Sequence, residues 1–250
     1  MARDEAIARA FSEHLIPPTL RFYSWATPAL TLGAFQTLEP EWVAALHANK
    51  IPCIRRITGG RALLHDQELT YSVVAGTEDP RFLGGIRQTF LTIANGLVTG
   101  LKKIGLTAKV HIPSRGATGG GRTGHPNRFC FASTSGHEIT VSGRKLIGSA
   151  QKRWSHHFLQ QGSLILNRGE ERISALFSPE HMITLSEILS PLPDDATLRN
   201  ALRQGMEDAL QMDSFPGGLI AEEREWASQL VDEKYRSEKW NQYRYCNDRR

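Results

Sequence analysis

The segment from Phe82 to Ile104 carries the pattern that most limits what this chain can fold into. Its apolar residues are three or four positions apart: Ile86, Phe90, Ile93, Leu97, Leu101 and Ile104. This spacing places them on one face of an α-helix. Gly96 and Gly100 lower the intrinsic helix propensity of the same segment. The chain must therefore provide an apolar surface for a long helix to cover.

Short strand-like segments surround this helix. We predict strands over 20–25, 29–35, 108–112, 138–141, 145–150 and 163–166, with a tight hairpin turn at Ser142 and Gly143. Further helices are predicted over 1–13, 198–210 and 220–235. Strands in the first two-thirds and helices at the end indicate an α+β fold. We predict a single domain over 1–250, because the helices after the proline-rich loop 190–195 are too few for a core of their own.

Composition and charge exclude several classes of protein. The chain has 30 basic and 26 acidic residues, a net charge of +4, which is too small an excess to indicate nucleic-acid binding. No stretch approaches the roughly 20 apolar residues of a membrane span. The three cysteines are far apart and form no disulfide framework or metal motif. We therefore expect a cytoplasmic protein that binds neither nucleic acid nor membrane.

The first segment that could carry chemistry is a glycine turn between basic residues. Adjacent glycines let the backbone bend closely around a ligand and point N–H groups at it. The flanking arginines could hold a carboxylate or phosphate. A hairpin turn with solvated arginines is the alternative. We favour a binding loop, whose candidate residues are Arg56, Thr58, Gly59, Gly60, Arg61 and His65.

The second segment places a lysine at the start of a strand of small and apolar residues. Lys145 would ordinarily extend its ammonium toward solvent. If it points into a pocket instead, it can hold a carbonyl oxygen or lower the pKa of a nearby thiol. Gly148, Ser149 and Ala150 leave room for a ligand beside the backbone.

The third segment contains Cys130 between two phenylalanines. A free cysteine is most often a small buried apolar side chain. With a cation beside it, the same thiol becomes a thiolate and an effective acyl acceptor. For Cys53, in an apolar run, we predict core packing, and Cys246 has no assigned role.

Two other patterns do not support a site. Residues 116–123 approach a phosphate-binding loop but have Arg122 where the motif needs lysine, and no helix follows. We expect 114–124 to form a mobile loop. His156 and His157 have no acidic or cysteine residue at metal-ligand spacing, so we predict a solvent-facing turn and no metal.

Together the three segments resemble one protein family. The stretches RRITGGRALLHDQELTYS, FCFASTSGHEITVSGRKLIGSAQKR and LQQGSLIL are similar to the biotin/lipoate protein ligase catalytic domain, and more narrowly to its cysteine-dependent octanoyltransferase branch. The opening LRFYSWATPALTLGAFQ and the closing EKYRSEKWNQYR fit as well. The resemblance covers nearly the whole chain and implies mixed β-sheets packed with helices.

The resemblance also implies an activity. Octanoyltransferases of this branch move an octanoyl group from acyl carrier protein to a lysine of a lipoyl carrier, either the glycine-cleavage H protein or a lipoyl domain, without a cofactor. The reaction passes through an enzyme thioester in lipoate biosynthesis. Cys130 matches the nucleophile and Lys145, fifteen residues later, matches the lysine that activates it. The turn Thr58–Ala62, His65 and Gly148–Ala150 match the walls of the acyl pocket.

Two alternatives remain at this stage. ATP-dependent lipoate ligases share the fold and the lysine, form a lipoyl-adenylate and would not need Cys130. They typically read SGGGAV where this chain reads TGGRAL. A non-enzymatic module that binds carriers or nucleic acid is the third possibility, and it predicts a salt-sensitive complex with no acyl transfer.

Overall fold

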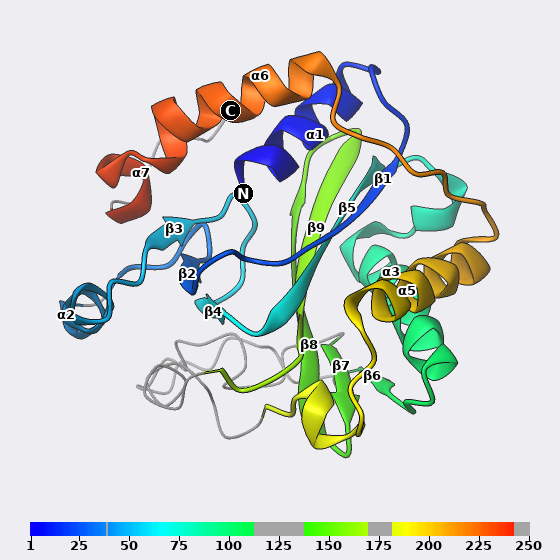
Figure 1. The fold of residues 1–250 in the computed structure, drawn as a ribbon. Coiled ribbons are helices and arrows are strands. Elements are labelled where there is room, and N and C mark those ends of the chain that lie inside the picture. Colours follow the sequence, from blue (N-terminus) through cyan, green and yellow to red (C-terminus); the bar gives the residue numbers. More distant parts are fainter. Residues whose placement is uncertain (39, 113–137, 170–181, 243–250) are drawn as a thin grey trace.

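The computed structural model describes residues 1–38, 40–112, 138–169 and 182–242, which form two β-sheets with helices around them (Figure 1). The large sheet is antiparallel throughout, in the order β1 (Thr19–Tyr23), β5 (Glu68–Gly76), β9 (His157–Ile165), β8 (Arg144–Arg153), β7 (Glu138–Val141) and β6 (Lys109–His111). The small sheet has the order β3 (Cys53–Arg55), β2 (Ala29–Leu32) and β4 (Leu63–His65). Strand β2 is parallel to β3 and antiparallel to β4, so the fold is α+β with a mixed sheet.

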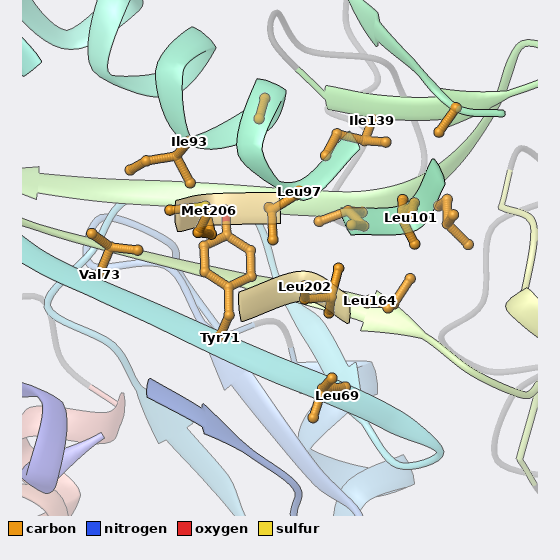
Figure 2. Packing of buried hydrophobic residues seen from close by; sticks show 14 of the residues in the cluster. Leu69, Tyr71, Val73, Ile93, Leu97, Leu101, Ile139, Leu164, Leu202 and Met206 are labelled. Atoms are coloured by element: carbon orange, nitrogen blue, oxygen red, sulfur yellow. The ribbon is translucent and has the colours of Figure 1, made fainter. Parts of the chain in front are cut away.

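Helices α3 (Gly85–Lys103) and α5 (Asp195–Leu210) cover one face of the large sheet (Figure 1). Figure 2 shows side chains of both helices meeting those of the sheet, with Leu97 and Leu202 above Tyr71 and Leu164. The periodic face predicted for Phe82–Ile104 is confirmed from Ile93 onward, whereas Ile86 is exposed. A short 3-10 turn, η1 (Pro80–Phe82), precedes the helix.

Glycines let α3 and α5 approach each other closely. A Cβ atom on Gly100 would lie 2.6 Å from the Cα of Leu202, and one on Gly205 would lie 2.1 Å from the backbone nitrogen of Gly100. The two glycines of α3 that lower its intrinsic propensity are thus explained by packing, because any side chain there would push the helices apart.

The opposite face of the large sheet is covered by α1 (Ala2–Ser12) and the small sheet. Ile7 of α1 packs in a cluster with Val74 and Leu159. The remaining elements are α2 (Pro40–Ala48), η2 (Leu185–Glu187), α6 (Ala221–Leu230), the π-helical turn η3 (Val231–Tyr235) and α7 (Glu238–Gln242). Helix α6 lies along α1 in Figure 1.

Most predicted elements are present, with two kinds of difference. Strands β8 and β9 are ten and nine residues long, because they continue past the short runs that the sequence pattern marked. Helix α2 and strands β3, β4 and β5 were missed, although the residues of β5 alternate between an apolar and a polar face. In the part of the chain that the structure describes, no helix is long and apolar enough to cross a membrane.

Candidate active site

The glycine turn lies against the middle of the large sheet, on the face opposite α3 and α5. A Cβ atom on Gly60 would lie 3.2 Å from the Cβ of Ala150. The hydroxyl of Thr58 donates a hydrogen bond of 3.1 Å to Oε1 of Gln161, which pairs with Ala150 across β8 and β9. Two segments that are ninety residues apart in the sequence therefore meet, as the resemblance implied.

Arg56 supports this turn from within. Its Nη1 donates to the backbone oxygen of Thr31 at 3.0 Å and to the hydroxyl of Thr31 at 2.5 Å. Its Nη2 donates to the backbone oxygens of Gly59 and Arg61, both at 3.0 Å. The buried guanidinium thus holds two carbonyls of the turn, and the expectation that Arg56 binds a substrate carboxylate or phosphate stays a prediction. The side chain of Arg61 is half-buried.

Arg55 performs a similar structural task in the small sheet. It is 1% exposed, and its Nη1 donates to the backbone oxygens of Gly33 and Gln36. Its Nε and Nη2 donate to the backbone oxygens of Trp240 and Asn241 in α7. This side chain ties the C-terminal helix to the loop beside the glycine turn.

His65 is buried in a directed chain of hydrogen bonds. Its Nε2 lies 2.8 Å from the hydroxyl of Thr31 and its Nδ1 lies 3.1 Å from Oε1 of Glu68. Burial lowers the pKa of His65, so the ring is neutral. A carboxylate can only accept, so Nδ1 carries the proton and Thr31 donates to Nε2. Trp25 stacks on the ring at 4.3 Å between centroids.

Glu68 links His65 to the large sheet. Its carboxylate accepts a hydrogen bond of 2.5 Å from the hydroxyl of Thr70 and another from the hydroxyl of Ser163. All three side chains are at most 3% exposed. Both ring nitrogens of His65 have partners in this hydrogen-bond network. In the described structure the residue therefore connects the small sheet to the large sheet.

A β-bulge places Lys145 on the same face as the glycine turn. Ile139 pairs with Ile147, but Thr140 pairs with Lys145, so β8 has one extra residue, Leu146. In a regular strand Lys145 and Ile147 would point to the same side. The extra residue reverses this relation, so Ile147 joins the core under α3 and Lys145 points the other way.

Lys145 is buried, 1% exposed, and forms an ion pair with Glu138 of β7. The alternative that its ammonium extends into solvent is therefore wrong. The carboxylate of Glu138 is itself 5% exposed. A buried ammonium requires a partner of this kind, because an isolated charge inside a protein is very costly.

The residues that follow Lys145 divide between the two faces of the sheet. Gly148 and Ala150 pair with Ser163 and Gln161 on the face of the glycine turn. The side chain of Ser149 points to the other face, where its hydroxyl lies 2.6 Å from that of Tyr71. Ser149 can therefore contribute to a site beside the turn only through its backbone.

Other predicted residues have different outcomes. Cys53 packs against the apolar cluster of the small sheet as predicted, and burial raises its pKa to about 11. Cys130, Cys246 and the loop 114–124 lie outside the described residues. His156 is exposed, and among the residues described no group of three or more His, Cys, Asp or Glu side chains could hold a metal ion.

Several residues of this region were missed by the sequence analysis. They are Glu138, Glu68, Ser163, Thr31, Gln161 and Trp25. In β5 the polar residues Glu68, Thr70 and Ser72 recur at every second position, a signal that could have indicated a polar face beside the glycine turn. The pairing of Glu138 with Lys145 depends on the bulge, which the sequence pattern does not show.

Comparison with known proteins shows which proteins are similar to this chain in sequence and in fold. The family model described as the lipoyl protein ligase A/B catalytic domain matches residues 1–207. Octanoyltransferase LipM of Kyrpidia tusciae is 38% identical and that of Bacillus subtilis is 34% identical, each alignment covering 96% of this chain and 93% and 92% of the relative. The crystal structure of lipoate-protein ligase A bound with ATP is 24% identical and has the same fold, with a TM-score of 0.79 over 96% of this chain and 92% of that chain.

Proposed function

The chain belongs to the lipoyl protein ligase A/B catalytic domain family, and from this premise we propose that it is an octanoyltransferase of lipoate biosynthesis. The observation that carries the proposal is its similarity, along nearly its whole length, to relatives named octanoyltransferase LipM. The likeness to lipoate-protein ligase A concerns the fold alone, so it does not favour the ATP-dependent reaction.

The reaction that we propose is thioester exchange followed by amide formation. The thiolate of Cys130 attacks the octanoyl thioester of acyl carrier protein, and the carrier's thiol leaves. The lysine amine of a lipoyl carrier, the glycine-cleavage H protein or a lipoyl domain, then attacks the acyl-enzyme. One thioester replaces another in the first step, so no ATP is needed. We place the reaction in the cytoplasm, where the separate cysteines stay reduced.

Lys145 supports this mechanism by its position and charge. It lies on the face of the glycine turn, and in the sequence it follows Cys130 by fifteen residues. A cation near a thiol stabilises the thiolate, which is otherwise only a few per cent of a cysteine at neutral pH. We therefore assign to Lys145 the activation of Cys130.

The walls of the proposed acyl pocket come from both sheets. The turn Thr58–Ala62 provides one wall and Gly148–Ala150 the other, and His65 lies nearby in a hydrogen bond with Glu68. In the described part of the chain, β8 pairs with β7 only as far as Ile147, so its residues 148–150 have a strand neighbour only at β9. Backbone N–H groups there, or in the glycine turn, are our candidates to stabilise the oxyanion.

Intact mass spectrometry tests this function. The protein is incubated with octanoyl-acyl carrier protein without ATP, and one octanoyl adduct is expected. Cys130→Ala should form no adduct, whereas the matched variant Cys53→Ala should retain it. Transfer at the wild-type rate by Cys130→Ala would contradict the mechanism. Adenylate formation from free lipoate and ATP, independent of Cys130, would instead identify a ligase.

A further inference from the structure

One row of paired residues crosses the large sheet beside the glycine turn. Arg21 of β1 pairs with Ser72 of β5, which pairs with Gln161 of β9. Gln161 in turn pairs with Ala150 of β8, so the four side chains point to one face of the sheet. The carboxylate of Asp4 in α1 lies over this row and is 0% exposed. The row therefore leads from a buried charge to the strand that the glycine turn contacts.

Asp4 fixes the direction of the Gln161 amide. Its Oδ1 accepts hydrogen bonds from Arg21 at 2.5 Å and from Ser72 at 3.0 Å. Its Oδ2 accepts one of 2.7 Å from Tyr23 and one of 2.6 Å from Nε2 of Gln161. Burial raises the pKa of Asp4, but neighbouring positive charges, Arg21 among them, bring it below its ordinary value, so the group is a carboxylate. A carboxylate only accepts, so the amide nitrogen must face Asp4 and the amide oxygen must face away from it.

Thr58 bonds the other end of this amide. Its hydroxyl donates a hydrogen bond of 3.1 Å to Oε1 of Gln161, and both side chains are buried. Thr58 is the residue directly before Gly59 and Gly60. The backbone nitrogen of Ala34 donates to the backbone oxygen of Thr58 at 2.9 Å, which ties the turn to the segment after β2. The turn is thus bonded to the small sheet through its backbone and to the large sheet through the hydroxyl of Thr58.

The hydrogen bond of Thr58 to Gln161 determines how closely the turn approaches β8. A Cβ atom on Gly60 would lie 3.2 Å from the Cβ of Ala150, so the space between turn and strand closes at this point. Ala150 is the cross-strand partner of Gln161, so the residue that holds Thr58 also lies beside this contact. Without the hydrogen bond the turn would stay with the small sheet, to which Arg56 bonds it, and its separation from β8 would no longer be fixed.

We propose that Gln161, held in direction by Asp4, is a positioning residue that sets the separation of the two walls of the acyl pocket and thereby its preference for acyl-chain length. The inference rests on the proposed function, because the walls are those assigned there to the glycine turn and to residues 148–150 of β8. Gln161 acts through Thr58 and takes no part in bond making. One methylene that does not fit an apolar pocket costs about tenfold or more in rate, so a fixed separation discriminates between chains of different length.

The ratio of acyl-transfer rates for two chain lengths tests the inference. Acyl-enzyme formation is followed by intact mass spectrometry with octanoyl- or decanoyl-acyl carrier protein, each supplied alone and without ATP. In Gln161→Met the side chain keeps its length but bonds neither Asp4 nor Thr58. We expect the decanoyl-to-octanoyl ratio to rise about tenfold. Thr58→Val, which lacks only the hydroxyl, should raise the ratio in the same direction, and Thr58→Ser, which keeps the hydroxyl, should retain the wild-type ratio.

Thr77→Val is the matched control. Thr77 is buried just after the end of β5, five residues after Ser72, and its hydroxyl donates a hydrogen bond of 2.9 Å to the backbone oxygen of Ser155. The variant loses one buried hydrogen bond, as Thr58→Val does, but not one that reaches the turn. Loss of stability lowers both rates together, so the ratio should equal that of the wild type. An unchanged ratio in either Gln161→Met or Thr58→Val would overturn the inference, as would an equal rise in the control.

Hydrogen exchange of the glycine turn tests the contribution of Asp4 without a substrate. Asp4→Ala removes the acceptor of the Gln161 amide but does not touch the turn. We expect peptides that cover the turn to exchange about fivefold faster, the change in local opening that one hydrogen bond produces. The matched variant is Glu5→Ala in the same helix, since the Glu5 carboxylate bonds Lys234 and Tyr235 instead. Equal exchange of the turn in these two variants would overturn the role of Asp4.

Failure of the proposed function gives a different result from failure of this inference. If the wild-type protein forms no adduct with either donor, the function is wrong and the inference falls with it. If the wild-type protein forms the octanoyl adduct and the variants keep its chain-length ratio, the function stands and the inference alone is wrong.

Discussion

At the scale of single residues, the region around the glycine turn is built by side chains that are occupied with protein partners. Arg56 and His65 read in the sequence as ligand-binding residues, yet they direct their polar atoms at Thr31, Glu68 and turn carbonyls. Residue types and motif spacing could predict where the region lies. They could not predict its internal bonds, because those arise between strands that are distant in the sequence.

Arg56→Lys tests whether the guanidinium supports the turn. Lysine keeps the charge but has three donors on one atom, so it cannot reach the four acceptors that Nη1 and Nη2 bond. We expect a loss of about 2–3 kcal/mol in the free energy of unfolding, measured with urea. If lysine is tolerated without loss, the four hydrogen bonds do not support the fold as described.

Gly33→Ala tests the close approach of two loops. A Cβ atom there would lie 1.9 Å from the backbone oxygen of Gly60, so the glycine turn must move away. We expect a loss of about 1–3 kcal/mol in stability, together with slower octanoyl transfer. Gly59→Ala is the matched control, since nothing lies within 4 Å of its Cβ position, and its stability should change by less than about 0.5 kcal/mol.

At the scale of elements, the helix α3 shows why a sequence pattern can be right and incomplete. The three-four spacing predicts the helix and the face that it buries. The reason for Gly96 and Gly100 lies in α5, more than a hundred residues later, whose Gly205 and Leu202 approach the α3 backbone. By intrinsic helix propensity alone such glycines destabilise the helix, whereas the close packing of the two helices requires them.

Gly205→Ala distinguishes these two descriptions. Propensity alone predicts a gain of about 1 kcal/mol, because alanine is the better helix former. The structure predicts a net loss of about 1–3 kcal/mol, because the added Cβ atom would lie 2.1–2.5 Å from backbone atoms of α3. Thermal unfolding, followed by circular dichroism, shows whether the variant is more or less stable than the wild-type protein. A stabilised variant would mean that the helices are not in this contact.

At the scale of the whole molecule, the fold could be predicted further than the site. The strands and helices have local signals and a family order, and most were found. The order of strands across the sheets has no local signal. Arg144 and Arg153, for example, are close in sequence but lie at opposite ends of β8, about 30 Å apart at the usual rise of a strand.

The buried His65 makes the stability of the whole chain depend on pH. Burial lowers its pKa below the ordinary value of 6.5, so the unfolded chain binds a proton before the folded one does. The stability from His65 is complete above pH 6.5 and decreases as the pH falls toward the folded-state pKa, by at most about 1.4 kcal/mol per pH unit. His65→Gln should reduce this slope between pH 6.5 and 5 in urea titrations. An unchanged slope would contradict a buried neutral ring.

The extra residue in β8 acts as a phase shift within the strand. The side chains of β8 before Leu146 point to the face opposite to the one that regular alternation back from Ile147 would give. The side chains after Leu146 follow regular alternation. Deletion of Leu146 would place Lys145 directly before Ile147, so regular alternation would keep these two side chains on opposite faces and Thr140 could still pair with Lys145. The face to which Lys145 points therefore depends on the register of β8 with β7 as well as on the residue type.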